Sequence, residues 1–337
     1  MCNDLRFTIY DLRFMIMKKI AILTGGDSGE YDISLKTASN VYEVLDRSLF
    51  TPYLIMIRGK EWFFIDEMQT KHDIDKNDFT LTIDGKKIVF DTVFIAIHGT
   101  PGENGKMQAY FDMMQIPYTG CDMFCSALTF NKYFCNVVVH HFGIPVAPSL
   151  HYYKDEEIDM KKIEEVCGFP CFVKPCNSGS SVGVTKAHTA DELQAAITEV
   201  FQYDNQFMIE KEIRGREVTC GVAVMNGKPK ALAITEIRSQ KEFYDYEAKY
   251  TPGFLELATP ADIAKELEEK IMHYSEIIFK RLNCKGVVRM DYIVAQNNTP
   301  YFLEINTIPG QTAMSIIPRQ VKYKGISIVD FYSQLLN

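Results

Sequence analysis

Short apolar runs separated by glycine-containing loops dominate the first third of the chain. Residues 20–23 form one such run, which predicts a buried strand, and the loop after it leads into a helical pattern over residues 32–45. A second unit repeats this order, with an apolar run over residues 93–97, a loop that begins at His98, and a helix over residues 106–114. Both loops follow the carboxyl ends of strands, where open α/β sheets bind ligands. Neither has the G-x-G-x-x-G spacing of a dinucleotide site, so tight turns are the preferred explanation of these glycines taken alone.

The pattern changes after residue 120, where a single helix over about 126–142 is followed by shorter strands and helices. Strands alternate with a long helix, residues 262–282, in the last third of the chain. Because Met17 directly precedes the first strand, we hypothesise that the fold begins near Lys18. We therefore expect four segments: residues 1–17 as an N-terminal extension outside the fold, 18–120 as an N-terminal α/β domain, 121–213 as a central domain, and 214–337 as a C-terminal domain.

Two apolar runs near the C-terminus carry polar side chains at every second position. Arg289 and Asp291 share one face of the first run, and Glu304 and Asn306 share one face of the second. If residues 297–298 are the two central residues of a tight hairpin, Asp291 lies opposite Glu304 and Arg289 opposite Asn306. Two carboxylates, an amide and a guanidinium would then meet on one patch of sheet.

Opposed carboxylates destabilise a sheet unless a cation lies between them. Oxygen ligands of this kind suit a hard ion, and Mg²⁺ usually completes its shell with water and substrate phosphate. The alternative is a solvated polar face of the hairpin. We favour the metal site, because Leu303 and Ile305 need the other face for the core.

A glycine- and serine-rich loop over residues 177–183 follows an apolar run that contains Lys174. Its small residues and backbone N–H groups suit a polyphosphate. The lysine precedes the glycines and residues 182–184 read as a returning strand, so the loop is not a Walker A motif. A flexible surface hairpin is the alternative, and the magnesium-like site elsewhere favours nucleotide binding.

Two further loops have the composition of a lid and of a substrate contact. Residues 244–250 are aromatic and charged without helical or strand periodicity, and a lid that carries Lys249 could exclude water and bring a positive charge to a phosphoryl group. Gly310 permits close backbone approach, and Ser315 could hydrogen-bond a carboxylate. An ordinary surface loop and a turn are the respective alternatives.

Composition excludes several classes of protein. The 337 residues are 47% hydrophobic and 24% charged, with a formal charge of −8, which argues against nonspecific nucleic-acid binding. We expect no membrane span, because no apolar stretch is long enough. Charges within residues 1–17 argue against a signal peptide, and nine cysteines without zinc or thioredoxin spacing indicate reduced thiols of a cytoplasmic protein.

Together and in this order, these segments resemble the D-alanine–D-alanine ligases of bacterial cell-wall synthesis, within the ATP-grasp superfamily. The resemblance extends from Lys18 to the C-terminus. It implies an α/β (α+β) chain with a three-domain ATP-grasp fold, in which an N-terminal open parallel α/β domain precedes two domains that hold the nucleotide between them. The matching motifs are Gly25-Gly26 with Glu30, His98-Gly99 with residues 102–105, Lys174-Pro175 with residues 179–183, residues 244–250, Arg289-Met290-Asp291, and residues 304–307 with Pro309-Gly310.

The resemblance also implies a role for each matching residue. ATP would be bound by Lys132, Lys174, Ser181, Glu210, Lys211 and Glu217, with the two lysines on its phosphates and the two glutamates on its nucleoside side. Two Mg²⁺ ions, which Mn²⁺ can replace, would be held by Asp291, Glu304 and Asn306. Catalytic roles would fall to Glu30, Ser180, Lys249, Tyr250, Arg289 and Gly310, and substrate contacts to His98, Ser315 and Ile316.

The implied reaction joins two D-alanines through an acyl phosphate, releasing ADP and phosphate, for peptidoglycan precursor synthesis. Glu30 would bind the first ammonium, Arg289 and the Gly310 N–H would stabilise the oxyanion, and a Glu30–Ser180–Tyr250 link would latch the lid. Tyr250 favours an amine as the second substrate, although isoleucine replaces the common leucine at position 316. The resemblance also implies a homodimer. Alternatives are a ligase that uses D-serine or D-lactate, and a noncatalytic ATP-binding module.

Overall fold

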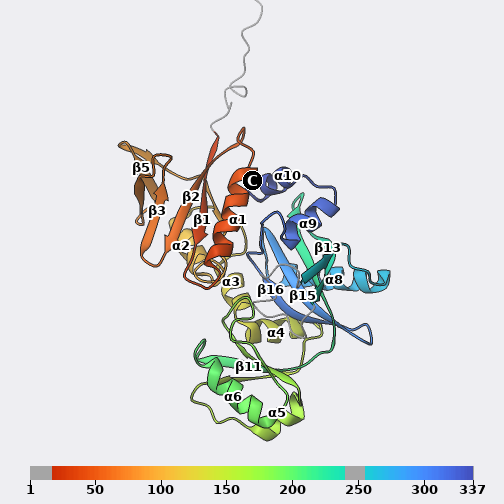
Figure 1. The fold of residues 1–337 in the computed structure, drawn as a ribbon. Helices are drawn as coiled ribbons and strands as arrows, with labels where there is room; N and C mark the ends of the chain where they lie inside the picture. The colour runs from red at the N-terminus through yellow and green to blue at the C-terminus, as the bar shows by residue number, and fades with distance from the viewer. Residues whose placement is uncertain (1–16, 240–254, 337) are drawn as a thin grey trace, which may run out of the picture.

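The computed structural model describes residues 17–239 and 255–336, whose strands form three separate sheets (Figure 1). The sheets follow one another along the chain, so each is built from a continuous part of the sequence. Among the described residues, no helix has the length and apolar character that a membrane crossing requires.

The first sheet has seven strands in the order β6-β5-β4-β3-β2-β1-β7. Its central strand β1 (Lys18–Gly25) pairs in parallel with β2 (Phe50–Arg58) and β7 (Thr92–Ile95). The middle of β1 is fully buried, as expected for a parallel strand covered on both faces. The remaining strands form an antiparallel meander that the sequence analysis did not anticipate: β3 (Glu61–Ile65), β4 (Lys71–Asp75), β5 (Thr80–Ile83) and β6 (Lys86–Ile88). The helices of this region are α1 (Tyr31–Val44) and α2 (Lys106–Met114).

The second sheet has four strands in the order β10-β9-β11-β8, and it lies at the bottom of Figure 1. Its strands are β8 (Ser149–Tyr153), β9 (Cys171–Pro175), β10 (Thr185–Ala187) and β11 (Gln206–Lys211). A separate apolar core joins this sheet to α5 (Met160–Val166) and α6 (Ala190–Val200). The returning strand β10 begins at Thr185, so the prediction of a strand over residues 182–184 was wrong.

The third sheet has five antiparallel strands in the order β14-β13-β12-β15-β16. Its strands are β12 (Gly215–Met225), β13 (Lys228–Ser239), β14 (Leu255–Ala258), β15 (Val287–Ala295) and β16 (Pro300–Asn306). Helix α8 (Lys265–Arg281) packs against it through Leu267, Ile271 and Ile278, which recur at helical spacing.

The helix predicted over residues 126–142 is two helices, α3 (Met123–Phe130) and α4 (Lys132–His141). Asn131 interrupts them with an extended backbone, and its side chain accepts a hydrogen bond from the Phe134 N–H at 3.1 Å. The asparagine therefore caps α4 instead of continuing a longer helix. Both helices share their apolar core with the third sheet.

The hairpin of β15 and β16 pairs its polar residues as predicted. Asp291 lies opposite Glu304, and Arg289 lies opposite Asn306. The predicted two-residue turn is nevertheless wrong, because the Ala295 N–H donates to the Thr299 carbonyl at 3.0 Å, which closes a three-residue loop.

A β-bulge next to Asp291 compensates for the longer loop. Between the Asp291–Glu304 pair and the Tyr292–Phe302 pair, β16 contains one extra residue, Leu303. The bulge restores the predicted pairing of the acids but exchanges the faces beyond it. Phe302 therefore packs in the core, whereas Leu303 is half-buried and was wrongly assigned to the core.

The last two helices connect the third sheet to the N-terminal part of the chain. Helix α9 (Ile316–Tyr323) packs on β12 and β13, and α10 (Ile328–Leu335) lies beside α1 (Figure 1). One apolar cluster joins Val41 of α1 to Ile317 and Phe331. This cluster fixes the first sheet relative to the third.

Candidate active site

A cavity of about 950 Å³ lies where the three sheets meet. Strands of the second and third sheets line it, and the N-terminal part of the chain contributes Glu30, His98 and residues of α1. Every predicted site residue in the described part of the chain is on its wall: Glu30, His98, Lys132, Lys174, Ser180, Ser181, Glu210, Lys211, Glu217, Arg289, Asp291, Glu304, Asn306, Gly310, Ser315 and Ile316. Lys249 and Tyr250 lie outside the described residues.

Asp291 is held from two sides on the cavity wall. The Arg289 guanidinium donates to both of its oxygens, with Nε 2.9 Å from Oδ1 and Nη2 2.8 Å from Oδ2. The Thr219 hydroxyl, directly across on β12, donates to Oδ1 at 2.5 Å. Thr219 is fully buried and Asp291 nearly so. The carboxylate therefore has little freedom to reorient.

Glu304 contacts a different cation. Lys132, the first residue of α4, has its ammonium 2.9 Å from Glu304 Oε2. Burial lowers the pKa of Lys132, but the charge and hydrogen bond of Glu304, together with the charges of Glu103 and Glu30, outweigh it, and the net shift of the pKa is upward. Lys132 is therefore fully charged at neutral pH.

Lys174 and Glu210 form a second buried ion pair across β9 and β11. The Asn136 amide lies 3.5 Å from the other oxygen of Glu210. Lys211 and Glu217, on the next residues of the same wall, complete this end of the cavity. Lys186 and Glu212, which form an ion pair at 2.8 Å, lie on the same wall.

The glycine-rich loop reaches across to the first sheet. Ser180 donates a short hydrogen bond to Glu30, so two of the three members of the predicted link are in contact. A β-carbon added at Gly179 would lie 2.6 Å from Glu30 Oε2, so a side chain there would displace the Glu30 carboxylate. Ser180 and Ser181 both have positive φ, 49° and 58°, so this loop is held in an uncommon conformation.

His98 and Glu103 are buried beside Glu30. Burial lowers the pKa of His98, aided by Arg289 and opposed by Glu30, so its imidazole is neutral at pH 7; its Nε2 lies 2.9 Å from the Thr37 hydroxyl. Burial, together with the Glu30 charge, raises the pKa of Glu103 to about 8. The Gly99 N–H donates to Glu103 at 2.8 Å.

Gly310, Ser315 and Ile316 form the wall nearest α9. The Ser315 hydroxyl lies 2.7 Å from the Thr312 hydroxyl and accepts from the Thr312 N–H at 3.0 Å. A β-carbon at Gly310 would approach Ser315 Oγ to 2.9 Å. Ile316 begins α9, and Gln320 one turn later bonds the Gly221 N–H and the Thr219 carbonyl, which ties this helix to β12.

Three residues beside the predicted set also hold the site together: Thr219, Glu103 and Gln320. Thr219 could have been found only by pairing β12 with β15, which local patterns do not reveal. Glu103 lies in the motif that begins at His98, but its burial depends on the surrounding chains. Gln320 occupies an ordinary helical position in the sequence.

The donor set on β15 and β16 fits a hard divalent ion. Asp291, Glu304 and Asn306 would each bind an ion through an oxygen atom, which is the ligand atom that hard ions prefer. The two acids are cross-strand neighbours on the cavity wall. Lys132 and Arg289 stand on either side of these acids and already balance part of their charge.

Both halves of the chain match known families. Residues 19–121 match the family described as "D-ala D-ala ligase N-terminus", and residues 138–337 match "D-ala D-ala ligase C-terminus". The D-alanine–D-alanine ligase of Flavobacterium johnsoniae is 44% identical over 320 residues, which cover 95% of this chain and 98% of that protein.

Two solved structures share the fold over nearly the whole chain. The VanG D-Ala:D-Ser ligase from Enterococcus faecalis is 33% identical with a TM-score of 0.86, covering 95% of this chain and 98% of that one. The D-alanyl-alanine synthetase A from Vibrio cholerae is 30% identical with a TM-score of 0.87 and the same coverage. The predicted α/β ATP-grasp fold class is thereby confirmed.

Proposed function

The chain belongs to the D-alanine–D-alanine ligase family, and from this premise we propose that it joins two D-alanines to D-alanyl-D-alanine while ATP is converted to ADP and phosphate. The product would serve peptidoglycan precursor synthesis. The observation that carries the proposal is the single cavity wall on which Asp291, Glu304 and Arg289 lie beside Lys132.

ATP would occupy the end of the cavity between the second and third sheets. Lys132 and Lys174 would contact phosphate oxygens, and Ser181 would offer its hydroxyl from the glycine-rich loop; all three line the cavity. Glu210, Lys211 and Glu217 would face the nucleoside. The support for this assignment is that all of them line one continuous surface.

Asp291, Glu304 and Asn306 would hold two Mg²⁺ ions, which supply positive charge to the phosphates when bound. Thr219 and Arg289 keep Asp291 in place, as second partners of metal ligands usually do. Mn²⁺ is expected to substitute, because the donors are all oxygen.

In the first step the carboxylate of one D-alanine would attack the γ-phosphorus of ATP, giving an acyl phosphate and ADP. Glu30 would bind the ammonium of this D-alanine, with neutral His98 beside it. Lys132, Lys174 and, from the lid, Lys249 would stabilise the charge that spreads over the phosphoryl oxygens.

In the second step the amine of the other D-alanine would attack the acyl carbon, and phosphate would leave. Ser315 would hold the carboxylate of this substrate, with Ile316 against its methyl group. Arg289 and the Gly310 N–H would stabilise the tetrahedral oxyanion. The two hydrogen bonds from Arg289 to Asp291 fix the guanidinium before the reaction, which is the preorganisation that such a role needs.

The contact between Ser180 and Glu30 closes the glycine-rich loop over the substrate side. Tyr250 would complete this link and exclude water, so that the acyl phosphate reacts with the amine.

The test is ADP release that depends on D-alanine, with chromatography of the product. We expect D-alanyl-D-alanine from the wild type and no turnover from Asp291→Ala or Glu304→Ala. Glu269→Ala, an exposed acid on α8, is the matched control and should keep full activity. Binding of Mg-ATP without D-alanine-dependent phosphate release would favour the noncatalytic module.

A second candidate is a ligase that takes D-serine as its second substrate. The 33% identity and TM-score of 0.86 with the E. faecalis D-Ala:D-Ser ligase favour considering it. Competition between D-alanine and D-serine in one assay, with D-lactate as a third arm, separates the candidates by product. Predominant D-alanyl-D-serine would replace the first proposal.

Three broader properties belong to the same proposal. The domain boundaries near residues 17, 120 and 213 stay part of the proposal, and their support is that the three sheets are built from successive chain segments. A homodimer is the family expectation, and analytical ultracentrifugation tests it. A cytoplasmic location is supported by the free thiols of the eight cysteines that the structure describes.

A further inference from the structure

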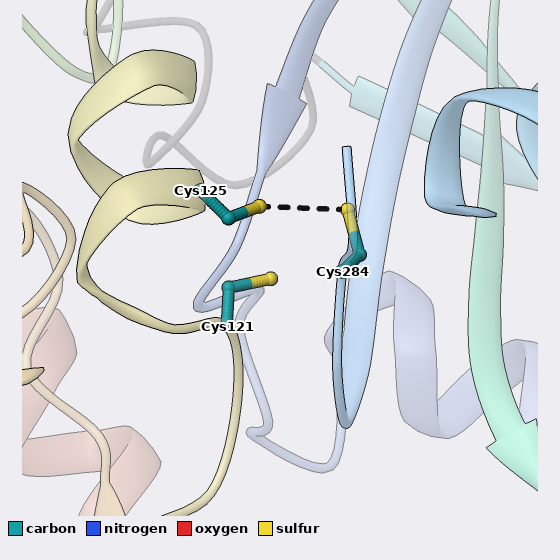
Figure 2. A group of neighbouring side chains, drawn as sticks. All are labelled: Cys121, Cys125 and Cys284. Carbon is teal, nitrogen blue, oxygen red and sulfur yellow. Dashed lines mark hydrogen bonds between the residues drawn. The ribbon is translucent and has the colours of Figure 1, made fainter. Parts of the chain in front are cut away.

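Three cysteines from distant parts of the chain meet outside the catalytic cavity. Cys121 precedes α3, Cys125 lies in its first turn, and Cys284 lies in the loop between α8 and β15. Their sulfur atoms all lie within 4.8 Å of one another, and those of Cys125 and Cys284 are 3.7 Å apart. Figure 2 shows the three side chains pointing toward a common space.

Close packing of the two backbones makes this arrangement rigid. Gly286 has φ of 64°, and a β-carbon there would lie 3.0 Å from the Gly120 nitrogen, so the two segments approach as closely as glycines allow. Asp122 accepts hydrogen bonds from the Cys125 N–H at 3.0 Å and from the Asn283 amide at 3.2 Å. The sulfur triangle is therefore set by the fold, before any ion binds.

Buried cysteines often act only as small apolar residues, and the other cysteines of the described chain fit that role. Cys121, Cys125 and Cys284 differ from the other cysteines because their three sulfur atoms lie close together. Within residues 17–239 and 255–336, these are the only three Cys, His, Asp or Glu side chains whose ligand atoms all lie within 4.8 Å of one another.

The separation of the Cys125 and Cys284 sulfurs matches that of two thiolates on one metal ion. A zinc–sulfur bond of about 2.3 Å places tetrahedral sulfur ligands about 3.8 Å apart, close to the observed 3.7 Å. The Lys285 carbonyl oxygen lies 3.8 Å from Cys121 Sγ and provides an oxygen donor beside the sulfurs.

We propose that Cys121, Cys125 and Cys284 form a structural site for a soft metal ion, Zn²⁺ in the first instance. The ion would tie the start of α3 to the loop that leads into β15, the strand that carries Arg289 and Asp291. It would brace the third sheet without contacting substrates. This inference is independent of the proposed reaction.

The test uses the full chain, expressed with added zinc, purified under reducing conditions and moved anaerobically into reductant-free buffer before metals are measured or added. We expect one zinc per chain by elemental analysis, an unfolding temperature that falls after chelation, and recovery on adding zinc. In the chelated protein, Co²⁺ should produce thiolate-to-metal charge-transfer absorption, a signal that carboxylate sites cannot give. A parallel titration with Cu⁺ identifies the ion: preference for Cu⁺ supports the soft-metal site and changes only the metal assigned to it.

Cys284→Ala should lose the zinc and the charge-transfer signal. Cys135→Ala is the matched control, a buried cysteine of the same apolar core that lies outside the triangle, and it should keep both. If Cys284→Ala does not fold, the wild-type stoichiometry and cobalt spectrum still decide the question. Absence of metal and of charge transfer in the wild type, or their retention in Cys284→Ala, would overturn the proposal.

Discussion

Replacing Thr219 by valine removes one hydrogen bond at the proposed metal site while keeping the shape of the side chain. The threonine hydroxyl donates to Asp291 Oδ1 at 2.5 Å, and both residues are almost inaccessible to solvent. Arg289 still donates to both carboxylate oxygens after the change. The acid is thus not left unsatisfied, but it loses the partner that fixes its orientation on the β12 side.

The expected effect is mainly on metal affinity. Loss of a partner to a metal ligand typically weakens metal binding by about 10- to 100-fold, or about 1.4–2.7 kcal/mol. A hydrogen bond to a charged group also contributes about 1.5–3 kcal/mol to stability, so the variant should unfold more easily. It should still fold, because valine fills the same volume.

The assay is ADP release at saturating ATP and D-alanine while free Mg²⁺ is varied. We expect the half-saturating Mg²⁺ concentration of Thr219→Val to rise by about 10-fold or more. Urea denaturation of the same preparation gives the stability change separately.

Thr235→Val is the control. Thr235 is also fully buried in the third sheet, and its hydroxyl lies 2.7 Å from that of Thr259 and accepts from the Gln320 amide at 3.0 Å. It should lose stability but keep the wild-type Mg²⁺ dependence. An unchanged Mg²⁺ dependence in Thr219→Val, or an equal shift in the control, would refute the reasoning.

Three further changes test other parts of the structure. Gly179→Ala places a methyl group 2.6 Å from Glu30 Oε2 and should lower kcat/KM for D-alanine by about 10-fold, whereas Gly29→Ala meets no atom within 4 Å and should retain wild-type kinetics; equal kinetics would argue against the loop contact. Because the native pKa of Glu103 is raised from 4.5 to about 8, the native state holds a proton that the unfolded state releases, so the free energy of unfolding should fall by about 1.4 kcal/mol per pH unit between those values. Denaturation of Glu103→Gln at several pH values should show that slope removed, and an unchanged slope would exclude this assignment. Asn131→Ala removes the α4 cap and should lower the free energy of unfolding, measured by urea denaturation, by about 1 kcal/mol or more. An unchanged free energy of unfolding would contradict the capping role and favour one continuous helix.

The local signals read from the sequence were sound where one periodicity dominated. Arg289 and Asp291 alternate with apolar neighbours on β15, and the structure places them on the cavity side while Met290 and Tyr292 lie in the core. Alternation is a property of the strand backbone itself, so it needs no tertiary information.

Predictions failed where a single residue changed the local geometry. Asn131 separates two helices whose apolar patterns run together in sequence, and Leu303 forms a bulge that alternation alone does not show. The acid pairing survived because the longer turn and the bulge shift the register by one residue in opposite senses. Agreement at Asp291 and Glu304 thus came from two compensating departures.

By itself, the sequence determined the kinds of side chain available and their order along each strand and loop: oxygen donors on β15 and β16, lysines before the glycine-rich loop, and hydroxyls within it. Only the tertiary structure decided which of these meet. Thr219 contacts Asp291, Ser180 contacts Glu30, and Cys284 joins Cys121 and Cys125 because sheet pairing and domain packing bring together residues far apart in the chain. The physical reason is that local periodicity is set by backbone geometry within a few residues, whereas long-range contacts depend on how whole apolar faces cover one another.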